Sequence, residues 1–321
     1  MASRTHNQGM AMMMALVILA IASSLAIGIW YNNQLSLARI SNLQKSYQAK
    51  HYSQGMLLWA SDILRQDYAQ DRKRHDSSLD AWQQGIQGML VEDALLSGTL
   101  VGLNSRFNVN NLVINGARSE PHLMYFRNLL LALELDINLA DKVVDWIDVD
   151  QIPEPNGAED FIYLAKSPSY QTSSSYFKHI QELSLLDGLS AEDFARLSPY
   201  ISALPVQNGF GTLMNVNTMP PVMLSALHSQ ISKEMALRLY QDGRADHENV
   251  DSFFQHETIR YLPGRDAMQN EVKKLVSTQT LFLQASSLVQ MEDSGFVMYA
   301  LLVRNSTGNA RVISRSLSPY L

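Results

Sequence analysis

Carboxylates are concentrated in one short stretch of the chain, DWIDVDQIPEPNGAED, at residues 145–160. Six of its sixteen residues are acids and none is basic, so its local charge of −6 equals the formal charge of the whole chain. Such a stretch can be an acid/base active site, a metal site or a solvated loop. The acids are Asp145, Asp148, Asp150, Glu154, Glu159 and Asp160.

Acid/base catalysis fits this stretch poorly. Carboxylates that act as general acid and base lie in a cleft with separated pKa values and usually come from different elements. Here the acids share one segment, and no His, Lys or Tyr lies within residues 145–160 to assist proton transfer. The chain also has no G-x-S-x-G motif and no H-E-x-x-H motif. We therefore do not expect an enzyme.

A calcium ion fits the stretch better, because calcium takes six to eight oxygen ligands that a single loop can supply. Against the EF-hand template, Asp148 is position 1, Asp150 position 3 and Glu159 position 12. Ile152 and Pro153 occupy positions 5 and 6, where the template fails. The stretch is therefore predicted to be an irregular acidic calcium loop, with a merely solvated loop as the alternative.

The composition limits the class of protein that carries this loop. A hydrophobic content of 46% and a charged content of 17% indicate a folded chain of 321 residues. The net charge of −6 argues against a nucleic-acid-binding surface, which needs a basic stripe. The absence of cysteine excludes disulfides and thiolate metal sites.

The N-terminus predicts a membrane helix. A polar leader with Arg4 and His6 precedes residues 10–30, which contain no charged residue. At about 1.5 Å per residue this segment spans about 31 Å, enough to cross the hydrocarbon core of a bilayer. Trp30 and Tyr31 stand where interfacial aromatic residues occur, and the basic leader favours a cytoplasmic N-terminus.

The rest of the chain alternates between helical and strand patterns. Apolar residues spaced three to five apart continue from Leu35 to Ile63, which predicts one long helix to about residue 70. Residues 97–114 predict strands joined by an Asn-rich turn. Short helical segments follow to about residue 277, and strands return after it. A helical domain inserted into a β-containing one is therefore expected.

Five pieces of sequence stand out, in this order along the chain: NQG/MAMMMALVILAIA, GLNSRFNVNNL, DKVVDWIDVDQIPEPNGAED, LSAEDFARLSPYISALP and MNVNTMPP. Together they resemble the K-class minor pseudopilin family of type II secretion (general secretion pathway protein K), and the resemblance covers nearly the whole chain. It implies a prepilin leader that ends at Gly9, cleavage before Met10 by prepilin peptidase, and methylation of the new amino terminus.

The fold that the resemblance implies is an α+β, type IV pilin-like fold, in which a long N-terminal transmembrane helix packs on an antiparallel sheet. A large inserted all-helical domain with helix-hairpin-helix-like units is expected within it. The expected divisions are a leader at 1–9, a transmembrane part at 10–31, the remaining helix and first strands at 32–116, the inserted domain at 117–278 and C-terminal strands at 279–321.

One position departs from ordinary pilins. Most pilins and pseudopilins have a glutamate five residues into the mature chain, and here that position is Met14. A carboxylate inside a membrane is costly unless it is paired, and in pilins it is thought to pair with a neighbour's amino terminus. The K class shares its absence, which suits a subunit at the end of the fibre.

The resemblance also implies calcium sites. The ligand set expected here is Asp145, Asp148, Asp150, Asn156, Glu159 and Asp160, with Glu154 a weaker candidate. The cation would remove the repulsion among these acids and stabilise the folded domain.

Two segments, 184–197 and 215–240, resemble helix-hairpin-helix units. DNA-binding hairpins need basic neighbours and glycines at the turn, whereas the first segment carries acids there and the second lacks the glycines. We expect them to pack against protein rather than DNA.

The function implied is a structural minor pseudopilin, anchored in the bacterial inner membrane with its main body in the periplasm, at the tip of the type II secretion pseudopilus. The implied partners are I-class and J-class minor pseudopilins, the major pseudopilin and prepilin peptidase, and secreted cargo or the outer-membrane secretin at the tip. A tip or minor pilin of a type IV pilus or DNA-uptake machine, with weak nucleic-acid binding, is the alternative.

Replacing Gly9 by alanine (G9A) should block cleavage, because the resemblance makes this glycine the residue that prepilin peptidase recognises. Mass spectrometry of the native N-terminus should find the leader retained in the variant. The unchanged chain should begin at Met10 and carry a methyl group. Mature protein of normal size from the variant would contradict the pseudopilin assignment.

Overall fold

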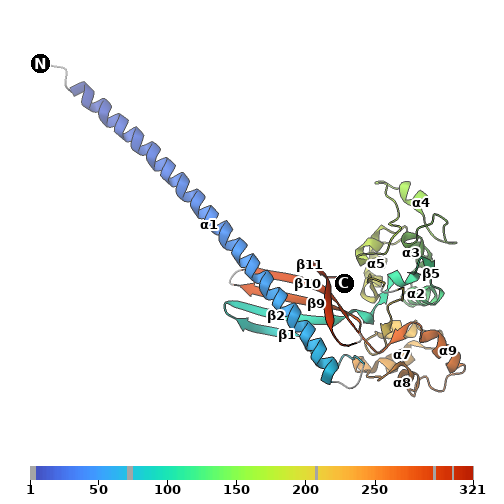
Figure 1. Cartoon of the computed structure of the whole chain (residues 1–321). Coiled ribbons are helices and arrows are strands. Elements are labelled where there is room, and N and C mark those ends of the chain that lie inside the picture. Colours follow the sequence, from blue (N-terminus) through green and yellow to red (C-terminus); the bar gives the residue numbers. More distant parts are fainter. Residues whose placement is uncertain (1–4, 71–74, 207–208, 292–293, 306, 321) are drawn as a thin grey trace.

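The computed structural model describes residues 5–70, 75–206, 209–291, 294–305 and 307–320, without the side chains of residues 5–8 and 70. Residues 1–4 of the leader expected at residues 1–9 therefore lie outside the described part, and the backbone of residues 5–9 belongs to the first helix. The dominant element is α1, Thr5–Gln70, a single helix of 66 residues (Figure 1). Its length confirms the prediction of one helix that continues to about residue 70.

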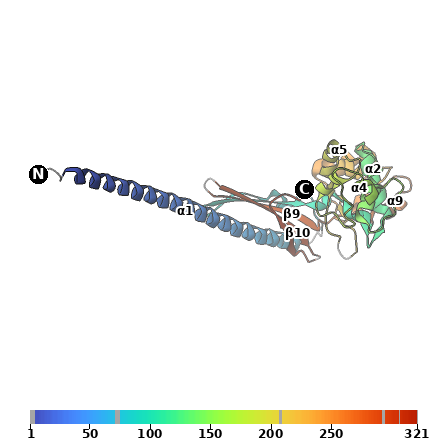
Figure 2. The ribbon, with the colours of Figure 1, turned by 90° about the horizontal axis from the view of Figure 1, so that it is seen from above.

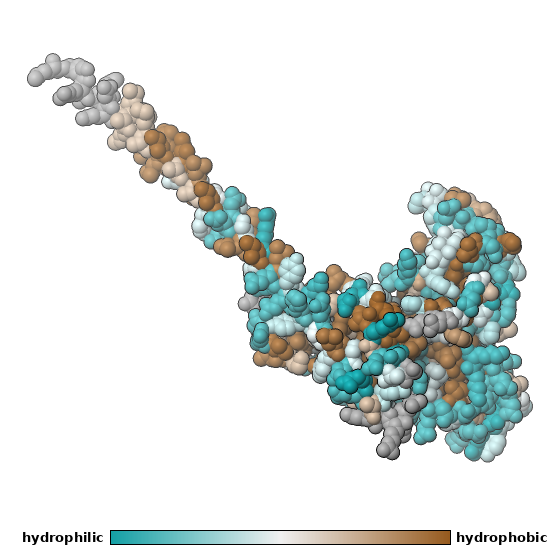
Figure 3. Space-filling view, viewed as in Figure 1, coloured by the Kyte–Doolittle hydropathy of each residue, from teal (hydrophilic) through white to brown (hydrophobic). Residues whose placement is uncertain are grey.

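The first half of α1 contacts no other part of the described chain. The large apolar side chains from Met10 to Tyr31 are all more than half exposed, and this part of α1 forms an apolar band in the space-filling view (Figure 3). α1 is the one described helix that is long and apolar enough to cross a membrane. It is therefore a candidate single-pass membrane anchor.

The second half of α1 packs on a five-stranded antiparallel sheet with the order β1-β2-β9-β10-β11 (Figures 1 and 2). Leu57 and Leu64 of the helix are buried against the sheet. The strands expected near the C-terminus are confirmed. The bounds are β1 Ile86–Val91, β2 Ala94–Gly102, β9 Phe282–Met291, β10 Ser294–Arg304 and β11 Ala310–Ser316, with the short 3-10 helix η1 Ala81–Gln84 before β1.

Burial on both faces explains the second half of the apolar run of β10, whereas Val297 in its first half is exposed. Residues 300–303 are all buried. Ala300 and Leu302 belong to the cluster under α1, whereas Leu301 and Val303 pack with Leu103 on the opposite face. A strand covered on both sides needs no polar alternation.

A long segment lies between β2 and β9, at the end of the molecule away from the N-terminus (Figures 1 and 2). It contains η2 Leu103–Ser105, β3 Phe107–Asn108, η3 Val109–Leu112, β4 Val113–Ile114, β5 Ala117–Arg118, α2 Glu120–Ala132, α3 Leu139–Ile147, α4 Asp160–Leu164, η4 Ile180–Leu185, α5 Ala191–Leu197, η5 Ser198–Tyr200, β6 Ile201–Ser202, β7 Met214–Asn215, α6 Pro221–Ser225, α7 Lys233–Tyr240, η6 Gln241–Gly243, α8 Val250–Phe254, α9 Arg265–Val272 and β8 Val276–Ser277.

This segment is mainly helical, but the expectation of an all-helical domain is wrong. It also contains three two-stranded pairs: β3 with β6, β4 with β5, and β7 with β8. The first and third pairs are parallel and join residues that lie far apart in sequence, Phe107 with Ile201 and Met214 with Val276. Such short parallel bridges leave almost no periodic signal, because each strand is two residues long.

These two parallel bridges close two units of the same design, which we call the first unit (residues 107–202) and the second unit (residues 214–277). In the first, the Asn110 side chain accepts from the backbone N–H of Phe177 at 2.9 Å and donates to its carbonyl at 2.9 Å. In the second, Asn217 makes the same pair with His247 at 2.8 Å and 3.0 Å. Each amide therefore takes the place of a neighbouring strand and satisfies both backbone groups of one buried residue.

The equivalence extends to the flanking residues. In the first unit the side-chain amides of Asn108 and Asn110 both donate to the backbone carbonyl of Leu204. In the second unit those of Asn215 and Asn217 both donate to the carbonyl of Asp76. Two residues after the paired residue, His179 and Asn249 each form a capping box that starts the next helix. The Asn-rich turn expected within residues 97–114 is thus a buried closing device.

Candidate functional site: an acidic loop on the first unit

The predicted acidic stretch forms the end of α3, a loop, and the start of α4. Two prolines, Pro153 and Pro155, prevent a continuous helix here. Gly157 is required for space, because a Cβ on this residue would lie 1.8 Å from Oδ2 of Asp145. The loop backbone therefore folds directly over the last turn of α3.

Three acids converge in this loop. Asp148, Asp150 and Glu159 each offer one carboxylate oxygen, and these three oxygens lie within 4.8 Å of one another. Asp150 is exposed, Asp148 is half-buried and Glu159 is fully buried. Oxygens at this spacing can coordinate one common cation, since calcium binds its ligands at about 2.3–2.6 Å.

Glu159 is the acid of this group whose burial most requires a positive counter-charge. Both of its carboxylate oxygens are buried, and neither has a hydrogen-bond partner within the described residues; the same is true of Oδ1 of Asp148. A buried carboxylate without a partner is costly unless it is protonated or bound to a metal. Burial, reinforced by the neighbouring acids, raises the pKa of both Asp148 and Glu159 to about 7.

Asp145 has a different role from these three. It is fully buried and accepts a hydrogen bond from the backbone N–H of Glu154 at 3.0 Å, and a further one from the backbone of Ala158. Burial raises its pKa to about 6, although these backbone donors favour the charged form. Asp145 therefore holds the loop in place beside the converging oxygens.

The remaining members of the predicted set have other partners. Asp160 accepts from the backbone N–H and the hydroxyl of Thr172, both at 2.8 Å. The Asn156 amide donates to Asp141 at 3.3 Å, and Glu154 forms an ion pair with Arg118. The structure thus brings Asp148, Asp150 and Glu159 together, places Asp145 beside them, and directs Asn156 and Asp160 elsewhere.

A second group of acids, Asp67, Asp76 and Asp80, was not predicted from the sequence. Its central member already has a positive partner, because Asp76 forms a buried ion pair with Arg304. Oδ2 of Asp80 accepts from the backbone of Ser77 at 3.0 Å. These three acids lie nine and four residues apart with basic residues among them and match no metal-binding motif, so no sequence signal identifies them.

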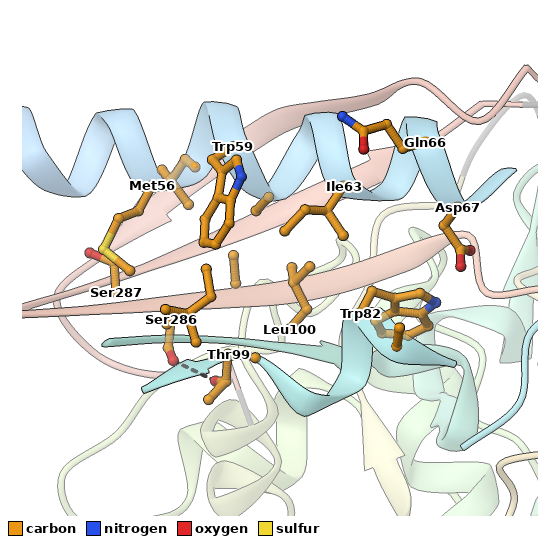
Figure 4. A pocket seen from close by; sticks show the side chains of 17 residues that line it. Met56, Trp59, Ile63, Gln66, Asp67, Trp82, Thr99, Leu100, Ser286 and Ser287 are labelled. Atoms are coloured by element: carbon orange, nitrogen blue, oxygen red, sulfur yellow. Dashed lines mark hydrogen bonds between the residues drawn. The ribbon is translucent and has the colours of Figure 1, made fainter. Parts of the chain in front are cut away.

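A cavity of about 370 Å³ lies between α1 and the sheet. Trp59 and Ile63 of α1 face Leu100 and Trp82 across it (Figure 4). Asp67 is the only titratable side chain among its lining residues. Among the described residues, the cavity therefore offers no pair of groups for acid/base chemistry.

Comparison with known proteins identifies the family. Residues 105–206 match a family model described as type II secretion system (T2SS), protein K. A type II secretion system protein K from Aeromonas hydrophila is 31% identical over 241 residues, which cover 71% of this chain and 72% of the relative. The chain belongs to the type II secretion system protein K family.

Two further comparisons cover most of the chain, one in sequence and one in fold. The protein K of Pseudomonas aeruginosa is 29% identical over 324 residues, covering 98% of this chain and 94% of the relative. The fold resembles a chain in the crystal structure of the GspK-GspI-GspJ complex of enterotoxigenic Escherichia coli, with a TM-score of 0.74, 20% identity, and coverage of 87% of this chain and 98% of that one.

The matched range has a structural meaning. Residues 105–206 include the whole first unit and its acidic loop. The second unit lies outside this match, although its closing asparagine and capping box repeat those of the first unit.

The metal-free wild-type protein should lose stability relative to its Glu159→Gln variant as the pH rises from about 4 to about 7. Burial raises the pKa of Asp148 and Glu159 to about 7 in the folded state, above the ordinary values of 3.8 and 4.5. At these two carboxyl groups the folded chain binds more protons than the unfolded chain in this window, and each proton lost there costs stability. Burial lowers the pKa of His122 and His247 to about 4, which acts in the opposite direction, and the comparison with the variant removes this contribution. Denaturant titrations of both proteins stripped of divalent ions, run between pH 4.5 and 8, should show a stability difference that grows in favour of the variant. A difference that does not change with pH would contradict the assigned burial of Glu159.

Proposed function

We propose that this protein K is a structural, non-enzymatic minor pseudopilin at the tip of a type II secretion pseudopilus. The observation that carries this proposal is the division of the molecule into a bare apolar helix at one end and a bulky helical segment at the other (Figure 1). The apolar helix would hold the chain in the inner membrane until Gly9 is cleaved, leaving a methylated Met10 and the main body in the periplasm.

The position at the tip follows from shape and from residue 14. The segment between β2 and β9 projects beyond the end of α1 (Figure 2), so a subunit stacked above it would meet this segment before it met the sheet. Met14 has no carboxylate to offer the amino terminus of a neighbour. Both features suit a subunit that starts or caps the fibre, with other subunits only below it.

The partners proposed are the I-class and J-class minor pseudopilins, because the structural relative was solved in a complex of GspK, GspI and GspJ. The membrane parts of α1 would pack with the equivalent helices of these partners. The major pseudopilin would lie below this complex, and the secreted cargo or the outer-membrane secretin would be met above it.

We also propose that the acidic loop holds calcium. Asp148, Asp150 and Glu159 fit a hard divalent cation, because they supply oxygen ligands and two of them have buried oxygens without partners. Further ligands would come from Asp145, from backbone carbonyls of the loop and from water. Asn156 and Asp160, which were expected as ligands, would contribute only by changing their present partners.

The helix pairs η4–α5 and α6–α7 would serve as helix-hairpin-helix-like packing units. Gly188, with a φ of +77°, makes the turn between the first pair. Asp187 and Asp193 surround this turn, and Asp187 pairs with Lys142 and Lys166. Lys142 and Lys166 are thus engaged by Asp187 and not free to bind phosphate, so a DNA-uptake function is not favoured.

The full-length chain should form a stable complex with the I-class and J-class pseudopilins of its own secretion system. The three proteins are co-expressed, extracted from membranes in detergent and purified by affinity through a tag on this chain. This purification should recover all three in equal amounts. The same chain expressed with the major pseudopilin alone is the control for non-specific helix association. Recovery of this chain without the other two would refute the proposed place at the tip.

Calcium should stabilise the wild-type chain and fail to stabilise the Glu159→Gln variant. At about a hundred to a thousand times Kd, binding to the folded state alone contributes roughly 3–4 kcal/mol. The variant removes the buried ligand, whereas the control Glu257→Gln changes an exposed acid elsewhere. Denaturant titrations with calcium and with chelator measure the difference. An equal calcium response in Glu159→Gln would exclude this loop as the site.

A further inference from the structure

The acidic loop belongs to an insertion that the repeated design does not need. In the first unit thirty positions separate the end of α3 at Ile147 from the paired residue Phe177, and in the second only seven separate Tyr240 from His247. The second unit closes on its asparagine and its capping box without any such loop. The extra residues of the first unit therefore have a use other than closing the unit.

This insertion exposes four large apolar side chains next to the converging carboxylates. Val149 is 79% exposed, Ile152 77%, Phe161 62% and Leu164 51%; we call these four residues the distal patch. Two lie in the loop between acids, and two lie on α4 directly after Glu159. Where α4 lies in Figure 1, apolar and polar surface adjoin in the space-filling view (Figure 3).

The patch is held from below by the buried side chain of α4 and by the hydrogen bonds that Asp160 accepts from Thr172. Tyr163 is the buried residue of α4, and its ring packs edge-on against Trp146 of α3 at 5.3 Å. Glu159 is the residue that directly precedes α4, and its side chain makes no capping hydrogen bond to this helix. A cation shared by Glu159 and Asp148 would fix α4 to the end of α3, and so would fix all four apolar side chains in one arrangement.

The charge around the patch is negative throughout. Residues 145–165 contain no Lys or Arg. Of the six acid charges of residues 145–160, one bound divalent cation and the ion pair of Glu154 with Arg118 leave three uncompensated. The nearest cations are engaged, Arg118 with Glu154 and Lys166 with Asp187. A partner for this surface must supply apolar side chains and Lys or Arg around them.

We propose that the distal patch is a cation-fixed docking surface for a protein partner whose own surface presents apolar side chains bordered by basic residues. The proposal rests on the proposed function, because that function places this end of the molecule at the tip of the fibre. The partner is distinct from the I-class and J-class pseudopilins, whose association the long helix is proposed to provide. The patch makes the apolar contacts. The acidic loop orients the basic partner and repels proteins with acidic surfaces.

The first test replaces all four patch residues by serine in the full chain, expressed in a secretor strain that lacks its own protein K. The control replaces four equally exposed apolar residues elsewhere by serine: Phe210, Leu237, Tyr261 and Leu317. Secretion of the strain's exoproteins should fall by about tenfold or more with the patch variant, since truncating several interface anchors costs more than 1 kcal/mol. It should stay near the wild-type level with the control.

Two measurements separate this outcome from misfolding and from failure of the proposed function. The patch variant must keep the calcium-dependent stability of the wild type, and it must still co-purify with the I-class and J-class pseudopilins. Secretion that is unchanged in the patch variant overturns the proposal. So does a loss of secretion that is accompanied by loss of the three-protein complex, because the patch would then belong to that complex.

The second test identifies the occupant. A photo-reactive phenylalanine analogue placed at Phe161, with Tyr261 as the control position, is cross-linked in living cells and the adduct is sequenced. The expected adduct is a segment of another protein in which Lys or Arg adjoins apolar residues, and its yield falls with chelator and with added salt. An adduct with a second copy of this chain, with the I-class or J-class protein, or with no protein at all overturns the proposal.

Discussion

Asp76 joins three parts of the molecule: the segment that begins at residue 75, the five-stranded sheet and the second unit. The placement of the helical segment depends on this residue. Its backbone N–H donates to Thr278 at 2.7 Å, and its carbonyl accepts from the two closing asparagines of the second unit. Its carboxylate accepts from the backbone of Thr280 at 2.5 Å and pairs with Arg304 of β10. Because this ion pair is almost fully buried, loss of either member would leave the other uncompensated inside the protein. The segment that begins at residue 75, the sheet and the second unit are thereby fixed to one another.

The sequence was sufficient where the signal is periodic and local. The long helix follows from apolar spacing between Leu35 and Ile63, and the C-terminal strands follow from their β-branched and aromatic content. The acidic loop was placed correctly because its charges are adjacent in sequence. These features depend on neighbours within a few residues, which a single sequence displays directly.

The sequence was insufficient where the partner lies far along the chain. The amide of Asn110 pairs with Phe177 and that of Asn217 with His247, so their structural role is invisible in the short motifs NVNN and NVNT. Within the acidic loop, Glu159 and Asp160 are adjacent acids with opposite outcomes. Glu159 is buried without a partner, whereas Asp160 accepts two bonds from Thr172. The direction in which α4 leaves the loop decides between them, and composition does not encode that direction.

A chain of contacts connects the acidic loop to the closure of its unit. Asp148 follows α3, whose Trp146 stacks on Phe177 with ring centroids 6.1 Å apart; Phe177 is in turn the residue that Asn110 holds through both backbone groups. A cation bound to the loop would therefore stabilise the first unit as a whole, as well as its own insertion. In the second unit the equivalent residue is His247, which packs on Phe253 at 5.3 Å and whose closing asparagine bonds to the carbonyl of Asp76. One unit is thus secured by the fixed joint to the sheet. The other, which carries the exposed distal patch, has the loop suited to a metal, and a cysteine-free chain has no disulfide to serve instead.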